Sequence, residues 1–196
     1  PDIPKVEWLG YVARDFDRIF LTDLDKNEWE KSVASFQQKL NDSVIRHAVR
    51  QLPPEIYRID GEKIIGKLIS RRNVLMDAAM KYYRFVSKQV NIVGSNQKEH
   101  FKVSSVGDKL QVRVYVRSKG YDTSFIMYNR IFDPSVTKEI RLYGLHDEDI
   151  FEIERSASSR IKLRIIGGRG IDTFDLKGKV EALLYDLKST GGDYYI

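Results

Sequence analysis

One turn in the second half of the chain has the residue types of a calcium site. It reads Gly167-Gly-Arg-Gly-Ile-Asp172. Glycines let a turn reach positive φ and expose its carbonyl oxygens, and an aspartate supplies the hard anionic oxygen that Ca²⁺ prefers. The chemistry to expect here is cation binding, with Asp172 as the main candidate ligand and Gly168 and Gly170 as carbonyl donors.

The turn belongs to a short internal repeat. Residues 139–153 align without gaps on residues 162–176, an offset of 23 residues. Each copy has a strand pattern, a turn with Gly and Asp, and a second strand pattern. The later copy matches the nonapeptide G-G-x-G-x-D-x-U-x of calcium-binding β-rolls, and a fixed offset predicts stacked coils of a solenoid or repeated strand pairs in one sheet.

The earlier copy of the turn is altered. It keeps Gly144, Asp147 and Asp149, but it has Leu145 and Glu148 where we expect glycine. One interpretation is a shallow calcium site in which Asp149 and Asp147 join Asp172 when the two turns stack. The other is a turn that only bends and caps strands, in which case no cofactor is expected.

Catalytic motifs are missing from the sequence. The three histidines, His47, His100 and His146, are far apart, and no H-E-x-x-H, P-loop or G-x-S-x-G pattern occurs. Cysteine is absent, which excludes disulfides and thiol catalysis. Asp15 and Asp17 are two residues apart on a predicted helix, so their side chains point in different directions. The sequence therefore predicts no active site.

Composition and charge are those of an ordinary globular protein. Of 196 residues, 42% are hydrophobic and 31% are charged, and the net charge is +5. Residues 1–95 hold 16 Lys and Arg against 13 Asp and Glu, and residues 96–196 hold 17 against 15. Because neither half concentrates positive charge, we expect no nucleic-acid binding.

No apolar run approaches the roughly 18 residues of a membrane span. The start at Pro1 without a leader suggests an excerpt or a processed chain.

The hydrophobic period changes near Gly94, which predicts an α+β chain: a helical, bundle-like region over residues 1–95 and an all-β domain over residues 96–196. Helices are expected at residues 8–20, 26–40 and 42–52, and Asp25 is expected to be the N-cap of the second. An extended piece is expected at residues 57–61, followed by a long helix at residues 62–88. Trp29 and Phe36 are expected to be buried together.

The second half predicts short strands in a sandwich or short solenoid. Gly107-Asp108 indicates a hairpin turn between the first two. The strands are expected at residues 100–104, 110–116, 124–130, 139–143, 150–153, 161–166, 173–176 and 180–185.

Several strings resemble a family of large, multidomain proteins of the Gram-negative cell envelope. They are Phe16-Asp-Arg-Ile-Phe-Leu21 with Trp29, Leu52-Pro-Pro-Glu-Ile-Tyr57, Leu68-Ile-Ser-Arg-Arg-Asn-Val-Leu75, Tyr82-Tyr83, Val93-Gly-Ser95 with Glu99, Thr137-Lys-Glu-Ile-Arg-Leu-Tyr-Gly-Leu145, and Arg164-Ile-Ile-Gly-Gly168 through Asp172. Members often carry an upstream calcineurin-like metallophosphoesterase domain and a downstream surface-antigen type outer-membrane β-barrel. The phosphoesterase motifs D-x-H, G-N-H-D and G-H-x-H do not occur in this chain.

The resemblance implies a middle region of such a protein, located in the periplasm or at the outer membrane. We expect a non-catalytic structural or interaction module whose partners are the neighbouring domains of the parent chain. The alternatives are an accessory region of a metallophosphoesterase whose catalytic domain lies elsewhere, and a calcium-stabilised β module. The sequence does not predict an oligomeric state.

Overall fold

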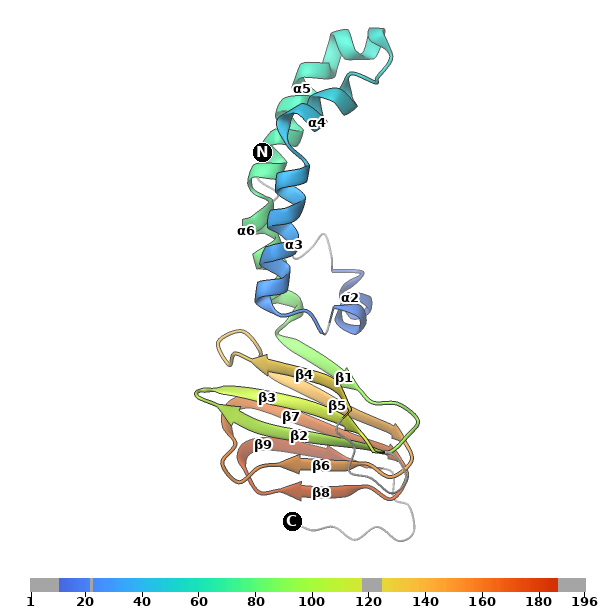
Figure 1. Cartoon of the computed structure of the whole chain (residues 1–196), viewed down its shortest axis with the longest axis vertical. Helices are drawn as coiled ribbons and strands as arrows, with labels where there is room; N and C mark the ends of the chain where they lie inside the picture. The colour runs from blue at the N-terminus through green and yellow to red at the C-terminus, as the bar shows by residue number, and fades with distance from the viewer. Residues whose placement is uncertain (1–10, 22, 118–124, 187–196) are drawn as a thin grey trace. The chain divides into compact units, whose positions relative to one another are not determined.

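The computed structural model describes residues 11–21, 23–117 and 125–186. As predicted, helices come first and strands second, so the chain is α+β (Figure 1). It divides into two compact units, a helical unit that contains residues 24–85 and a β unit that contains residues 15–23 and the chain from Val86 onward. No helix in the described ranges is long and apolar enough to cross a membrane.

Two of the helices, α3 and α4, begin at capping side chains. Helix α3 (Lys26–Lys39) starts after Asp25, which confirms the predicted N-cap. The Asp25 carboxylate accepts a hydrogen bond from the amide of Glu28, and the Glu28 carboxylate accepts one from the amide of Asp25, so the two residues form a capping box. Helix α4 (Asp42–Val49) is capped by Asn41. The other helices are α2 (Arg14–Phe20), α5 (Pro54–Asn73) and α6 (Leu75–Val86).

The sequence-based prediction for residues 57–88 is partly wrong. Residues 57–61 are not extended but belong to α5, which starts at Pro54. Proline is well tolerated in the first helical turn, where its missing N–H would have no partner, so Pro54 starts α5, while α4 has already ended at Val49. The expected single long helix is also two, α5 and α6, separated at Val74.

The core of the helical unit is small. Ile45 and Val49 of α4 pack with Ile65 of α5, and partly buried apolar side chains surround them. The predicted burial of α3 is wrong for Phe36, which is 53% exposed, and Trp29 is only half-buried. Since α3 has no buried residue, its stability depends on its capping box and on contacts of its partly buried side chains.

The β unit contains nine strands in the described residues. They are β1 (Gln89–Val93), β2 (Glu99–Val106), β3 (Lys109–Val116), β4 (Ile126–Phe132), β5 (Glu139–His146), β6 (Ile150–Ile153), β7 (Ser158–Arg169), β8 (Thr173–Leu176) and β9 (Lys179–Tyr185). Strand β1 was not predicted. The predicted β2–β3 hairpin is confirmed, with Val106 opposite Lys109 across the Gly107-Asp108 turn.

These strands form two sheets, and apart from the consecutive strands β2, β3 and β4 the chain alternates between them (Figure 1). The first sheet has the order β1-β5-β7-β9, and all its pairs are parallel. The second has the order β4-β3-β2-β6-β8, in which β2, β6 and β8 are parallel and the β3–β4 hairpin is added at one side. The pairs β1–β2, β5–β6 and β7–β8 are therefore successive coils of a short solenoid.

The 23-residue offset of the sequence repeat is also the offset between paired residues in adjacent coils. Glu139 pairs with Lys162, and Phe151 pairs with Phe174, both at the predicted offset. Inside the coils, side chains of both sheets make one apolar core. At its centre Phe101, Phe151 and Phe174 stack, with ring centroids 4.7 and 5.4 Å apart.

Candidate functional site

The two predicted aspartate ligands lie in adjacent coils at the same place. Asp149 precedes β6 and Asp172 precedes β8, and the backbone amide of Asp149 donates to Oδ1 of Asp172 over 2.9 Å. Both residues are buried, with relative exposures of 1% and 5%. The structure therefore brings Asp149 and Asp172 together, but inside the turn region rather than on its surface.

A third acid, Glu99, extends this arrangement to the first coil. Its amide donates to Oδ1 of Asp149 over 2.8 Å, and its own carboxylate accepts from the amide and hydroxyl of Ser95. Glu99 is fully buried. We call Glu99, Asp149 and Asp172, together with Asp186 after β9, the acid column. The links from Glu99 to Asp149 and from Asp149 to Asp172 each satisfy a backbone amide that would otherwise be buried without a partner.

Glycines make room for the acid column. A Cβ on Gly144 would lie 2.3 Å from Oδ2 of Asp149, and one on Gly167 would lie 2.3 Å from Oδ2 of Asp172. In the first coil, a Cβ on Gly94 would lie 2.7 Å from Oε2 of Glu99. Real Cβ atoms essentially never lie so close to another atom, so a side chain at these positions would force the carboxylate or the facing backbone to shift. The shared pattern is a glycine followed five residues later by an acid.

The electrostatics of the column follow from its burial. The pKa of Asp149 is raised to about 7, mainly by burial and also by the charges of Glu99, Asp172 and Asp147, while the hydrogen bond from the Glu99 amide lowers it. Burial and the charge of Asp186 also raise the pKa of Asp172. Oδ2 of Asp149 and Oδ2 of Asp172 accept no hydrogen bond from the described residues. The column thus holds negative charge in a place that disfavours it.

The remaining candidate ligands lie on the two turns themselves. Leu145 pairs with Gly168, and a Cβ on Gly168 would lie 2.3 Å from the carbonyl oxygen of Leu145. A Cβ on Gly170 would likewise lie 1.7 Å from the carbonyl oxygen of Asp147. These glycines therefore let the second turn lie directly against the first.

The alignment of the turns corrects one detail of the sequence analysis. Continuing the observed register places Asp147, not Glu148, opposite Gly170. Leu145 and Asp147 adopt φ of 81° and 75°, so the earlier turn keeps a conformation that favours glycine without having the glycines. The side chain of Asp147 lies 3.9 Å from Nζ of Lys98, at the outside of the turn.

No group of three or more His, Asp or Glu side chains in the described part of the chain is arranged to hold a metal ion. The calcium interpretation of Asp172, Asp149, Asp147, Gly168 and Gly170 stays a prediction. Sequence reasoning missed Glu99, Asp186 and the role of Gly144. The glycine-to-acid spacing was visible in the sequence, but the first coil lacks the rest of the repeat.

The outer face of the second sheet carries a row of ion pairs. Nε2 of His100 lies 2.9 Å from the Glu152 carboxylate, and Lys102 bridges Glu152 and Glu154 at 3.4 and 3.0 Å. The hydrogen bond to Glu154 is the main cause that raises the pKa of Lys102. These groups neutralise one another on an open sheet face, which is the arrangement of a polar surface rather than of a catalytic cleft.

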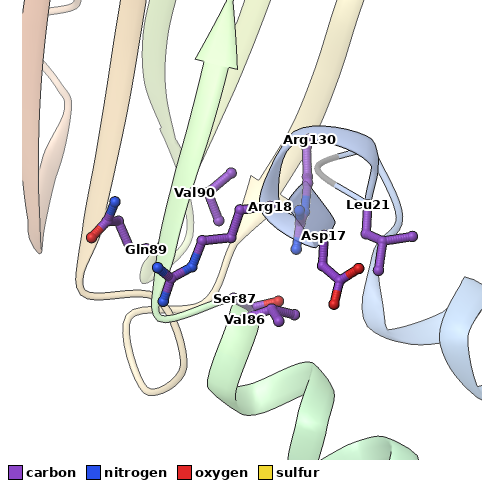
Figure 2. A pocket seen from close by; sticks show the side chains of 8 residues that line it. All are labelled: Asp17, Arg18, Leu21, Val86, Ser87, Gln89, Val90 and Arg130. Atoms are coloured by element: carbon purple, nitrogen blue, oxygen red, sulfur yellow. The ribbon is translucent and has the colours of Figure 1, made fainter. Parts of the chain in front are cut away.

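The β unit also has a small hollow beside α2 (Figure 2). It is lined by Asp17, Arg18, Leu21, Val86, Ser87, Gln89, Val90 and Arg130. The Arg130 guanidinium lies 4.8 Å from the centre of the Phe132 ring. In Figure 2, side chains from α2 lie over the start of β1 and beside β4. Helix α2 therefore covers part of the first coil, as a terminal cap does in repeat proteins.

Comparison with known proteins adds no assignment, since no family model, curated protein or solved structure matches this chain. The resemblance noted in the sequence therefore stays a prediction.

Proposed function

We propose that this chain is a non-catalytic structural and interaction module of a larger cell-envelope protein. The observation that carries the proposal is the acid column, because its buried carboxylates accept backbone amides of neighbouring coils. Carboxylates used in this way hold the coils in register and are not available to a substrate. The partners would be neighbouring domains of the parent chain, in the periplasm or at the outer membrane, as the sequence resemblance implies.

The exposed faces of the β unit suit such a role. On the first sheet, Glu139 pairs with Arg141 of its own strand and lies 3.3 Å from Arg164 of the next. The Glu139 carboxyl is partly desolvated, yet the two arginines hold its pKa below the usual range. Flat, charge-paired faces resemble the polar rim of a protein interface, where complementarity gives specificity.

The runner-up is an accessory region of a metallophosphoesterase. A phosphatase assay on the whole chain with added Mn²⁺ or Zn²⁺ tests whether the chain is catalytic. Robust turnover would contradict the proposal that it is a non-catalytic module. The positive test uses the regions that flank this segment in the parent protein, expressed separately and titrated against the labelled chain. Saturable binding supports a module that links domains, and turnover without binding supports the enzyme.

A calcium-stabilised β module is the second alternative, favoured by the nonapeptide at residues 167–175. Asp172 would be its main ligand, with Asp149 and Asp147 from the adjacent turn and the carbonyls of Gly168 and Gly170. With so few carboxylates, binding would be weak, roughly in the 10⁻⁴–10⁻³ M class of extracellular modules.

A further inference from the structure

The positive charge of the helical unit is concentrated in one part of it. Residues 24–62 hold six Lys and Arg against seven Asp and Glu, so that stretch is balanced. Residues 63–85 hold six against one, an excess of five positive charges. Counting the first half of the chain as a whole hides this difference. The excess lies in the second part of α5 and in α6.

Five of the six cations lie on one side of these two helices. Lys67 and Arg71 follow Lys63 at intervals of four residues, and Arg84 follows Lys81 at three, spacings that keep side chains on one helix face. Lys81 comes 18 residues after Lys63, which is five turns at 3.6 residues per turn. We call these five residues the basic stripe.

The basic stripe continues from α5 into α6, which follows directly on it (Figure 1). The amide of Val74 donates to the carbonyl of Ser70, and the amide of Ala78 donates to the carbonyl of Val74. Both bonds span four residues, as they do in an uninterrupted α-helix. The helical faces of α5 and α6 therefore stay in phase across the boundary at Val74.

The rest of the helical unit packs on the other side of α5 and α6. The Trp29 ring of α3 lies 5.8 Å from the ring of Tyr83, and Nε2 of Gln37 donates to the carbonyl of Arg72. Arg72 is the sixth cation, and its guanidinium pairs with the Asp42 carboxylate at 2.6 Å. Packing within the helical unit therefore leaves the basic stripe uncovered.

All five side chains of the basic stripe are exposed, and most of them have no acidic partner. Lys63 lies 3.8 Å from Asp60, while no ion pair joins the other four to a described residue. Asp77, four residues before Lys81, is the other acid on this side. Unpaired cations on one face repel one another, so an anionic surface placed against them gains attraction without breaking an existing ion pair.

Two exposed isoleucines continue the stripe toward the start of α5. Ile59 is 77% exposed and Ile56 is 48% exposed. They lie four and seven residues before Lys63, on the same face of the helix. Aliphatic side chains beside lysines are typical of a helix that lies on an anionic bilayer, where the charged ends of long side chains reach the phosphates. The stripe and these isoleucines include no aromatic residue, although aromatic rings are the usual anchors of protein interfaces and single-stranded nucleic-acid sites.

We propose that the basic stripe binds the headgroups of an anionic lipid bilayer, with α5 and α6 lying along the membrane surface. From Lys63 to Arg84 the stripe is about 32 Å long at 1.5 Å per residue, so it contacts several headgroups at once. Ile56 and Ile59 would enter the boundary between headgroups and acyl chains. This inference goes beyond the module proposed above, because it gives the helical unit a lipid partner in addition to neighbouring domains.

The test is co-sedimentation of the full chain with vesicles of phosphatidylcholine alone and with vesicles of equal parts phosphatidylcholine and phosphatidylglycerol. We expect binding to the anionic vesicles only, and weaker binding as salt is added, because salt screens exposed charges. The variant that combines Lys67→Gln, Arg71→Gln and Lys81→Gln should lower the partition coefficient roughly 100-fold, about fivefold for each cation near the bilayer.

The matched control removes the same charge elsewhere in the helical unit. It combines Lys31→Gln, Lys39→Gln and Arg50→Gln, which are exposed positions on α3 and at the end of α4. This control should keep most of the wild-type binding. Equal losses in the two triple variants, or equal binding of the wild type to neutral and anionic vesicles, would overturn the proposal.

Two further outcomes also overturn it. Binding of a DNA duplex through the stripe without binding of anionic vesicles would make it a nucleic-acid site. If the stripe variant binds vesicles as the wild type does but no longer binds the flanking regions of the parent protein, the stripe contacts an acidic neighbouring domain. Circular dichroism checks that each variant keeps its helices. If the triple variant does not, Lys67→Gln and Lys81→Gln are measured singly, each with an expected loss of about fivefold.

Discussion

The backbone amide of Asp149 donates to the carboxylate of Asp172, which lies 23 residues further along the chain and one coil further along the stack. The same relationship joins Glu99 to Asp149 one coil earlier. A buried carboxylate is costly unless its hydrogen bonds are made, and here each bond also satisfies a backbone amide. The acid column therefore fixes which coil lies against which.

Adding one methyl group beside the column should destabilise the β unit. In Gly144→Ala the new Cβ would meet Oδ2 of Asp149 and the carbonyl of Gly167, so backbone or carboxylate must shift. We expect a loss of about 2–3 kcal/mol, the usual cost of overpacking. Amide exchange of β5 and β7 measures it.

Gly66→Ala is the matched control for this change. Gly66 is an exposed residue within α5, and a Cβ there meets nothing within 4 Å. Because alanine restricts the unfolded chain and favours helix, we expect a gain of roughly 0.5–1 kcal/mol in the helical unit. If both substitutions have the same small effect, the close contact at Gly144 does not constrain the coils.

The register of the coils could be predicted from the sequence because repeated coils need repeated side chains. The alignment of residues 139–153 on residues 162–176 places each core residue of β5 and β6 on its counterpart. Register errors in a sheet would turn every core side chain to solvent, so the pattern is strongly constrained. The same reasoning identified Asp149 and Asp172 as neighbours.

Other features could not be predicted from local patterns. Strand β1 is short, and its five residues continue directly from the helical region, so periodicity alone does not separate it. Glu99 lies in a coil that strands β3 and β4 separate from the later coils along the sequence, although β2 and β6 are neighbours in the sheet. This separation hides the equivalence of Glu99 to Asp149. The exposure of Phe36 arises because α3 buries no residue, a property of tertiary packing and not of helical spacing.

The stacked rings at the centre of the core give a second prediction. Phe151 lies between Phe101 and Phe174, at centroid distances of 4.7 and 5.4 Å, and is 1% exposed. Phe151→Ala removes both ring contacts and leaves a cavity, so we expect a loss of about 3–5 kcal/mol. Phe125→Ala is the control, because Phe125 is largely exposed and its loss should change stability by less than about 0.5 kcal/mol. Urea unfolding followed by far-UV circular dichroism compares the two, and equal costs would contradict the assigned core.

In the helical unit, Trp29 and Phe36 should behave differently. The Trp29 ring lies 6.3 Å from that of Tyr82 and 5.8 Å from that of Tyr83, whereas Phe36 is mostly exposed. Because Trp29 is only half-buried, Trp29→Ala should cost about 2–3 kcal/mol, below the value for a full core position. Phe36→Ala should change stability by no more than about 0.5 kcal/mol. Thermal melts of both variants decide, and a larger cost at Phe36 than at Trp29 would contradict the exposed position of Phe36.

Calcium should not stabilise the chain at neutral pH. Oδ1 of Asp172 already accepts the amide of Asp149, and its side chain is 5% exposed, so a cation would have to displace a structural hydrogen bond. The measurement is thermal melting in millimolar CaCl₂ against EDTA, repeated with Asp172→Ala. A ligand that binds only the folded state adds RT ln(1 + [L]/Kd), about 1.4 kcal/mol at ten times Kd. A shift of that size that disappears in Asp172→Ala would make the turn a calcium site. A shift that survives the substitution would place any bound calcium elsewhere in the chain.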